Sequence, residues 1–252
     1  LSGSVASELS YQASGPFSQP NLSRKGDYLT RTTNSAVEVF AVDSGQKVRT
    51  FSGSLKAFTF SHDSSRVVFA ANGPRLKVLD FATGDVLIDR PLSFNVSTIA
   101  TGNISNRIAL GNTDGIRVLD ETGNQVLSVP IAPNTELSSL TWSPDDQRLV
   151  AGVRRSGWKG VWVVDAASGL RLAEHETLGV IASQLAVRNG PFEIWSASNA
   201  LVRIGTGVEL ISANIGGRAS CFVDATSQRI VTSSSTATNV LAAQTGYLLH
   251  SI

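Results

Sequence analysis

The sequence of 252 residues contains no methionine and one cysteine, Cys221. A single thiol cannot form an internal disulfide, so the fold has no disulfide framework, which is compatible with a reducing compartment such as the cytoplasm. Charged residues make up only 16% of the chain and the net charge is +1, so no global field would recruit nucleic acid or an anionic membrane. No apolar run approaches the length of a membrane span, and we predict no signal peptide from the first residues of the sequence.

Residue types that carry catalytic or metal chemistry are also scarce. The three histidines, His62, His175 and His250, are widely separated, so no metal site is predicted. The sequence has no G-x-S-x-G nucleophile motif and no glycine-rich phosphate loop. Cys221 lies in an apolar strand pattern that is typical of a buried, inert thiol. We therefore predict no catalytic residue, no metal and no cofactor.

What the chain does contain is a recurring pattern of two apolar runs joined by a short turn that ends in glycine. These glycines are separated by 39, 39, 46, 38 and 39 residues: Gly45, Gly84, Gly123, Gly169, Gly207 and Gly246. Glycine supplies the positive φ that closes a tight hairpin. Val, Ile, Thr and aromatic residues dominate the runs and none keeps a helical spacing, so the sequence predicts strands.

A second turn recurs earlier in each repeat, as in FSHDSSRVVFA at Phe60–Ala70 and WSPDDQRLVAG at Trp142–Gly152. The combination of F/W-S-x-D, an apolar strand and V-x-D-x-x-S/T-G resembles the bacterial WD-repeat-like β-propellers over roughly Gly15–Ile252. The chain lacks the Gly-His and Trp-Asp dipeptides of eukaryotic members, so their buried Asp-His-Ser/Thr-Trp network is not assigned. Quinoprotein and lactonase-type propellers carry similar turns.

The resemblance and the period near forty imply an all-β propeller of about six four-stranded blades. The expected blades cover residues 15–53, 54–93, 94–134, 135–177, 178–217 and 218–252. Residues 1–14 are then a surplus strand or tail. Two alternatives stay open: six blades that close a ring by themselves, or a fragment of a seven- or eight-bladed ring within a longer protein.

The one long interval indicates an insertion at residues 154–160 of the fourth repeat. In the geometry of the family, loops between the second and third strands share one face with the loops between blades, and such variable loops carry function. The candidate binding residues on this face are Arg154, Arg155, Trp158, Lys159, Arg75 and Arg218. The same face is expected to carry Arg90, Asp114, Glu136, His175 and Glu176.

Because Arg and Trp are enriched at interface hot spots, one interpretation is a basic contact loop with an exposed Trp158 that binds an acidic protein or peptide segment. The alternative, which the sequence favours, is a lengthened hairpin whose Trp158 folds back onto the blade, on a surface of ordinary mixed charge. The other tryptophans, Trp142, Trp162 and Trp195, lie in apolar strands and are predicted core residues. Four aspartates recur before the glycine turns and are predicted to cap the hairpins: Asp43, Asp80, Asp120 and Asp165.

The sequence favours a non-catalytic protein-interaction platform, in which a WD-repeat-like propeller acts as a scaffold or sensor domain of a larger protein. The alternative is a propeller enzyme, a hydrolase or quinoprotein-like catalyst, with a dispersed active site in the central funnel. A third hypothesis, which family context alone suggests, is a substrate-recognition domain beside a kinase or protease in a bacterial signalling protein. The expected partner is a protein or peptide rather than nucleic acid or a membrane.

Overall fold

The structure is a computed structural model. It describes residues 18–23, 25–33, 35–53, 55–71, 73–178, 181–182, 184–188, 193–197, 200–205, 208–213, 220–223, 229–233, 238–242 and 248–251. This part of the chain consists of strands and turns without any helix, and accordingly no helix able to cross a membrane occurs in it. The predicted tail at 1–14, the candidate residue Arg218 and the turn glycines Gly207 and Gly246 lie outside the described residues.

The described strands form six antiparallel sheets of four, and in each sheet the strands lie side by side in the order of the sequence. The first three sheets are β1 (Ser18–Leu22), β2 (Tyr28–Thr32), β3 (Ala36–Ala41) and β4 (Lys47–Ser52); β5 (Leu55–Phe60), β6 (Arg66–Ala71), β7 (Arg75–Asp80) and β8 (Val86–Pro91); and β9 (Thr98–Thr101), β10 (Ile108–Gly111), β11 (Gly115–Leu119) and β12 (Gln125–Pro130). The last three are β13 (Glu136–Trp142), β14 (Arg148–Arg155), β15 (Trp158–Asp165) and β16 (Arg171–Glu176); β17 (Gln184–Arg188), β18 (Glu193–Ala197), β19 (Ala200–Ile204) and β20 (Val208–Ala213); and β21 (Ser220–Val223), β22 (Arg229–Ser233), β23 (Thr238–Ala242) and β24 (Leu248–Ser251). The prediction of an all-β chain built from four-stranded units is confirmed.

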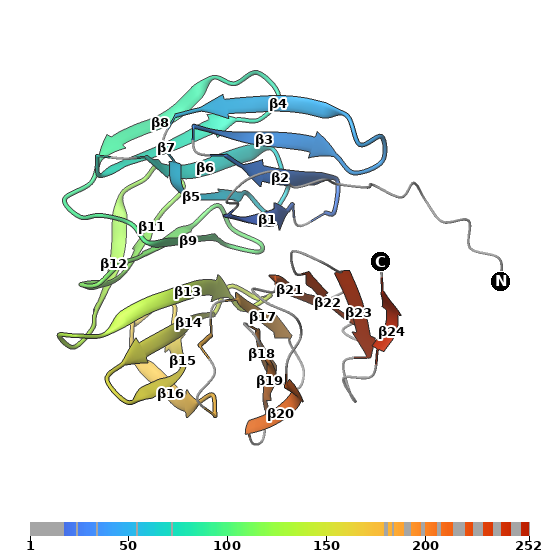
Figure 1. The fold of residues 1–252 in the computed structure, drawn as a ribbon. Helices are drawn as coiled ribbons and strands as arrows, with labels where there is room; N and C mark the ends of the chain where they lie inside the picture. The colour runs from blue at the N-terminus through green and yellow to red at the C-terminus, as the bar shows by residue number, and fades with distance from the viewer. Residues whose placement is uncertain are drawn as a thin grey trace.

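The sheets are arranged around a common axis like the blades of a propeller (Figure 1). The first strand of each sheet lies innermost: β5 contacts β9, β9 contacts β13, β13 contacts β17, β17 contacts β21, and β21 adjoins β1. The fourth strands, such as β4, β8, β12 and β16, lie at the outer rim. Each sheet is therefore a radial blade with one edge at the axis and the other at the circumference.

The core lies between successive blades. One cluster joins the first and second sheets, with Val39 against Phe60 and Val67, and others lie between the second and third, the third and fourth, and the fourth and fifth sheets. A middle strand has an apolar cluster on each side and is therefore buried on both faces. In β14 and in β15, five consecutive residues are buried. This burial explains why the middle strands are continuous apolar runs instead of alternating ones.

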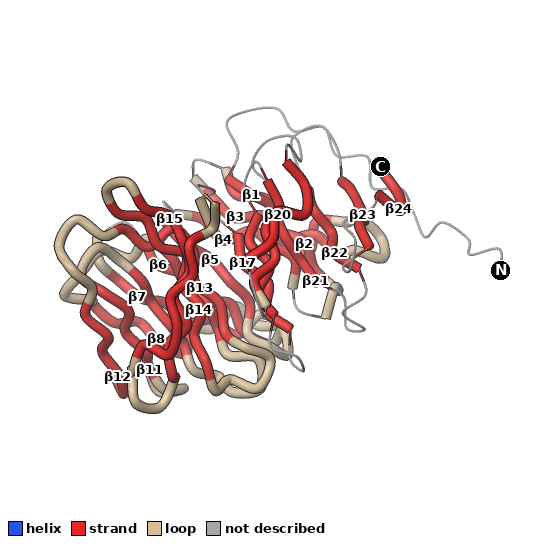
Figure 2. The backbone as a smooth tube through the Cα atoms, turned by 90° about the horizontal axis from the view of Figure 1, so that it is seen from below, coloured by secondary structure: helices blue, strands red, loops and turns tan. Residues whose placement is uncertain are grey.

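The meander places the turns on two faces of the molecule, and Figure 2 shows the strands ending in loops at both. On one face the turns between first and second strands bond to those between third and fourth strands, as when Phe81 N–H donates to Ser65 O at 2.8 Å. On the other, the connections between blades bond to the turns between second and third strands, as when Leu92 N–H donates to Pro74 O at 2.6 Å. We call the first the glycine-turn face and the second the connection face.

The glycine turns have the predicted conformation. Gly45, Gly84, Gly123 and Gly169 have φ of 66°, 84°, 84° and 76°. The preceding aspartate caps the turn in three of the four, since the carboxylates of Asp80, Asp120 and Asp165 accept backbone N–H bonds from Thr83, Thr122 and Ser168 at 2.8, 2.9 and 2.7 Å. The structure shows no such bond to Asp43; in that turn Ser44 Oγ accepts from Gln46 N–H at 3.4 Å.

Replacing Gly84 by Ala is expected to destabilise the protein by about 1 kcal/mol, because an L-residue is strained at φ of 84°. The new methyl group would also displace the end of the Arg49 side chain, which lies 2.6 Å from the Cβ position. Urea denaturation of both proteins measures the difference. An unchanged midpoint would contradict the hairpin assignment.

Candidate interaction surface

The insertion of the fourth repeat is not a loop. The strands β14 and β15 contain eight residues each and pair without interruption from Arg148–Asp165 to Arg155–Trp158. Only Ser156 and Gly157 form the turn, and Gly157 has the φ of 71° that such a tight turn requires. The expected loop conformation is therefore wrong, and the alternative of a lengthened hairpin describes the segment. Its end lies on the connection face.

The arginines of this hairpin are neutralised by carboxylates of the same sheet. Arg154 forms an ion pair with Glu136, its register partner on β13. Arg155 Nη2 lies 2.7 Å from Glu174 Oε1, and Arg171 Nη1 lies 3.1 Å from the other oxygen of Glu174. The surface of the hairpin thus carries alternating charge, and the prediction that it is a basic loop is wrong.

The side chain of Trp158 is half-buried and packs against the apolar cluster between the third and fourth sheets, as Leu127 and Ile131 also do. A Cβ at Gly160 would overlap the indole, so this glycine leaves the space that the ring occupies. The guanidinium of Arg155 covers the ring, with its Cζ 4.6 Å from the ring centroid. The expectation of an exposed Trp158 is wrong; the residue supports the hairpin and holds Arg155 by a cation–π contact.

The remaining candidates are spread over the connection face. Lys159 lies opposite Arg154 on β15, and its carbonyl oxygen accepts both the N–H and the Oγ1–H of Thr177, at 2.9 and 3.1 Å. Arg75 belongs to the second sheet, where Asp89 forms an ion pair with it and raises the pKa of its guanidinium. Arg154, Arg155 and Lys159 therefore form one group, whereas Arg75 is separate.

One residue of this surface was absent from the sequence-based candidates. Leu178 follows Thr177, is 56% exposed, and has a φ of 51°. A left-handed conformation is unfavourable for leucine by roughly 1 kcal/mol, and backbone strain of this kind concentrates at functional positions. Leu178 adds an exposed apolar side chain beside the charged hairpin. The four residues Arg154, Arg155, Lys159 and Leu178 are called the hairpin surface below.

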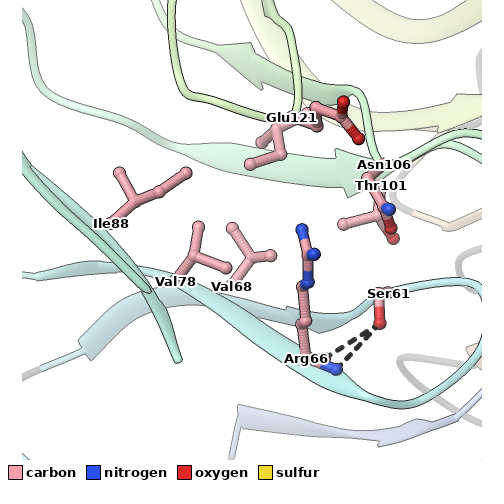
Figure 3. Close-up of a pocket in the computed structure, with 9 residues that line it drawn as sticks. Ser61, Arg66, Val68, Val78, Ile88, Thr101, Asn106 and Glu121 are labelled. Carbon is pink, nitrogen blue, oxygen red and sulfur yellow. Dashed lines mark hydrogen bonds between the residues drawn. The ribbon is translucent and has the colours of Figure 1, made fainter. Parts of the chain in front are cut away.

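A narrow crevice lies between the second and third sheets (Figure 3). Its cavity volume is about 10 Å³, which suffices for roughly one water molecule. The guanidinium of Arg66 points from β6 into the crevice, and the Oδ1 atom of Asn106 is buried there without a hydrogen-bond partner. This crevice is too small for an organic substrate. Among the described residues, moreover, no three His, Cys, Asp or Glu side chains gather as a possible metal site.

No protein-family model and no curated protein matches the sequence. The β-propeller domain of Cps50 (Swd1) from Myceliophteria thermophila superposes with a TM-score of 0.73 at 14% identity, over 96% of this chain and 87% of that domain. Hydrazine synthase from Kuenenia stuttgartiensis superposes with a TM-score of 0.71 at 15% identity, over 89% of this chain and 76% of that one. At such identities the likeness concerns the fold alone, and the chain has the fold of a β-propeller.

Proposed function

We propose that the protein is a non-catalytic protein-interaction platform, a WD-repeat-like propeller that acts as a scaffold or sensor domain, and that its partner binds at the hairpin surface. The observation that carries the proposal is the β14–β15 hairpin, whose strands exceed every other second or third strand in length. The fold needs no such extension, because the neighbouring blades pack with strands of four to six residues.

The chemistry of the hairpin surface suits a protein partner. Ion pairs between exposed side chains contribute only about 0–1 kcal/mol, so Arg154 and Arg155 can exchange Glu136 and Glu174 for carboxylates of a partner at little cost. Stacking on Trp158 holds the Arg155 side chain in place, which reduces the conformational entropy lost on binding. Leu178 offers an apolar contact next to these charges. The expected partner segment therefore carries carboxylates and an apolar side chain.

The test compares partner recovery by two matched double variants. Arg155→Glu/Leu178→Ser changes the hairpin surface and spares the packed Trp158. Lys77→Glu/Ile104→Ser changes another ion-paired cation and another exposed apolar residue elsewhere on the molecule. From a lysate of the source organism, the immobilised wild type and the second variant should retain the same proteins, whereas the first should retain them at least tenfold less. Equal recovery by all three would contradict the proposal.

A further inference from the structure

The outer strands of the first four blades share a feature that the hairpin surface does not include. In each, the pairing with the third strand skips one residue, which forms a β-bulge three residues after the turn glycine. The skipped residue is apolar and about half exposed in all four blades: Val48 47%, Leu87 48%, Val126 56% and Leu172 53%. We call these four residues the rim row. Single exposed apolar residues are normal, but the same register repeated in four consecutive blades is a pattern.

The rim row follows the circumference of the propeller, where β4, β8, β12 and β16 lie (Figure 1). The glycine turns of the second, third and fourth blades rest on the outer strand of the preceding blade. Arg49 donates to Ala82 O at 2.5 Å and Arg90 donates to Gly123 O at 3.0 Å, while a Cβ at Gly169 would lie 3.1 Å from Leu127 Cδ1. Val86 and Leu170, which are 54% and 67% exposed, lie within two residues of the row. Neighbouring blades are thus linked by contacts of residues next to the row.

The glycine turns beside the rim row carry carboxylates and no lysine or arginine, whereas the outer strands carry the cations Lys47, Arg49, Arg90 and Arg171. Each of the four turns carries an aspartate that forms no ion pair within the described part of the chain: Asp43, Asp85, Asp120 and Asp165. The cations of the same outer strands are already engaged. Lys47 pairs with Glu38 at 3.2 Å and Arg171 with Glu174 at 3.1 Å, and Arg49 and Arg90 bond to turn carbonyls.

The bulges also restrict how a partner can bind. A bulge interrupts the regular ladder of an edge strand and increases its twist, which opposes the addition of another strand. A partner must therefore contact the side chains of the rim row rather than extend a sheet. We propose that the rim row and its turn aspartates form a second docking surface, which binds a protein segment that carries apolar and basic side chains.

The test uses a fluorescein-labelled peptide of alternating leucine and lysine, and a matched peptide in which glutamate replaces lysine. Fluorescence anisotropy measures binding of each to the 252-residue chain. The variant Val48→Thr/Leu87→Thr/Val126→Thr/Leu172→Thr removes the apolar row and retains side chains that suit strands. The control is Ile104→Thr, since Ile104 is 66% exposed and lies in the turn between β9 and β10.

Wild type and the control should bind the leucine–lysine peptide with equal affinity, and the fourfold variant should bind it at least tenfold more weakly. Wild type should bind the leucine–glutamate peptide at least tenfold more weakly than the leucine–lysine peptide. Equal binding of the leucine–lysine peptide by the fourfold variant would overturn the proposal, as would equal binding of the two peptides by wild type. A wild-type dimer in sedimentation velocity that the fourfold variant abolishes would overturn it too, because the surface would then bind a second copy of the chain. Melting temperatures of the variants confirm that each is folded.

Discussion

Replacing Asp146 by alanine is expected to destabilise the protein by about 3 kcal/mol. The carboxylate belongs to the turn between β13 and β14, is only 4% exposed, and accepts the backbone N–H groups of Asn103, Ile104 and Ser105 at 2.5, 3.0 and 2.8 Å. These donors belong to the preceding blade, so the side chain ties the third blade to the fourth. Alanine would remove the acceptor of these three part-buried N–H groups, which costs about 1–3 kcal/mol for each group that water cannot reach, and would occupy a φ of 56°.

Asp146→Asn is the matched control for the effect of charge. Asparagine tolerates positive φ and keeps one acceptor oxygen, so we expect a loss of about 1.5 kcal/mol, roughly half that of alanine. Urea denaturation at pH 7 measures both values. A loss below about 0.5 kcal/mol for alanine would show that the contact between the blades is not formed in solution.

The stabilisation by Asp146 should also depend on pH. Burial by itself would raise the pKa of this carboxyl, but the hydrogen bonds from the Asn103 N–H and from Ser105 and Ile104 outweigh it and lower the pKa below its ordinary value. A carboxyl with a lower pKa in the folded state stabilises the fold above its unfolded pKa of about 4, and this contribution is lost as the pH falls through the folded value. The difference between wild type and Asp146→Asn should therefore stay constant above about pH 5 and shrink below about pH 4. A difference that grows on acidification would contradict this sign.

The second large effect is expected at Gly152, where alanine should destabilise the protein by about 3 kcal/mol. Gly152 lies on β14 against the connection to the fifth blade. A Cβ there would overlap the carbonyl oxygen of Ala182 and would lie 2.7 Å from Ser138 Oγ. The hydroxyls of Ser138 and Ser139 both donate to this carbonyl, at 2.7 and 2.5 Å. The methyl group would thus force the fourth and fifth blades apart, and overpacking of this kind costs about 1–3 kcal/mol in addition to any hydrogen bond that is lost.

Gly157→Ala provides the comparison for Gly152→Ala. Gly157 has a φ of 71° and no atom within 4 Å of its Cβ position, so this substitution adds backbone strain alone, about 1 kcal/mol. Thermal denaturation of both variants should give a clearly larger loss for Gly152→Ala. Equal losses would show that the blades do not approach as closely at Ala182 as the structure indicates.

The fold could be predicted from the sequence because its signals are local. Turn glycines such as Gly84 and Gly123 require positive φ whatever surrounds them, and the apolar runs between them identify strands. The period then indicates how many units there are. The buried positions of Trp142 and Trp162, which are 2% and 4% exposed, follow equally from their apolar surroundings.

The candidate surface was harder to predict because it depends on the pairing of distant residues. Arg155 is neutralised by Glu174, 19 positions away, and only the register of β15 and β16 shows that the two side chains meet. The uninterrupted pairing of β14 and β15 likewise determines that Trp158 folds back. The turn at Ser143–Asp146 was recognisable from its composition, but the donors to Asp146 lie about forty positions upstream in another blade. The one local signal for them is the small residue Gly102, where a Cβ would lie 2.7 Å from the Asp146 carboxylate.

The rim row shows a similar limit. An apolar residue three positions after each of the first four turn glycines is visible in the sequence, but alternation along a strand does not say which side of the outer strand it occupies. The bulge decides this, because it inserts one residue and turns the side chain toward solvent. The exposure of Val48 and Val126 therefore required the pairing register.

Photo-crosslinking from the tip of the β14–β15 hairpin tests whether a partner protein binds there. A photoreactive residue replaces Ser156, which forms the turn with Gly157. A second protein carries the photoreactive residue at Ile104 as a control. After irradiation in cells of the source organism, we expect a discrete crosslinked protein from position 156 that disappears when Arg155→Glu is added, and no such product from position 104. Identical crosslinking patterns from the two positions, or a product that Arg155→Glu leaves unchanged, would contradict the assignment of the hairpin as the site of partner binding.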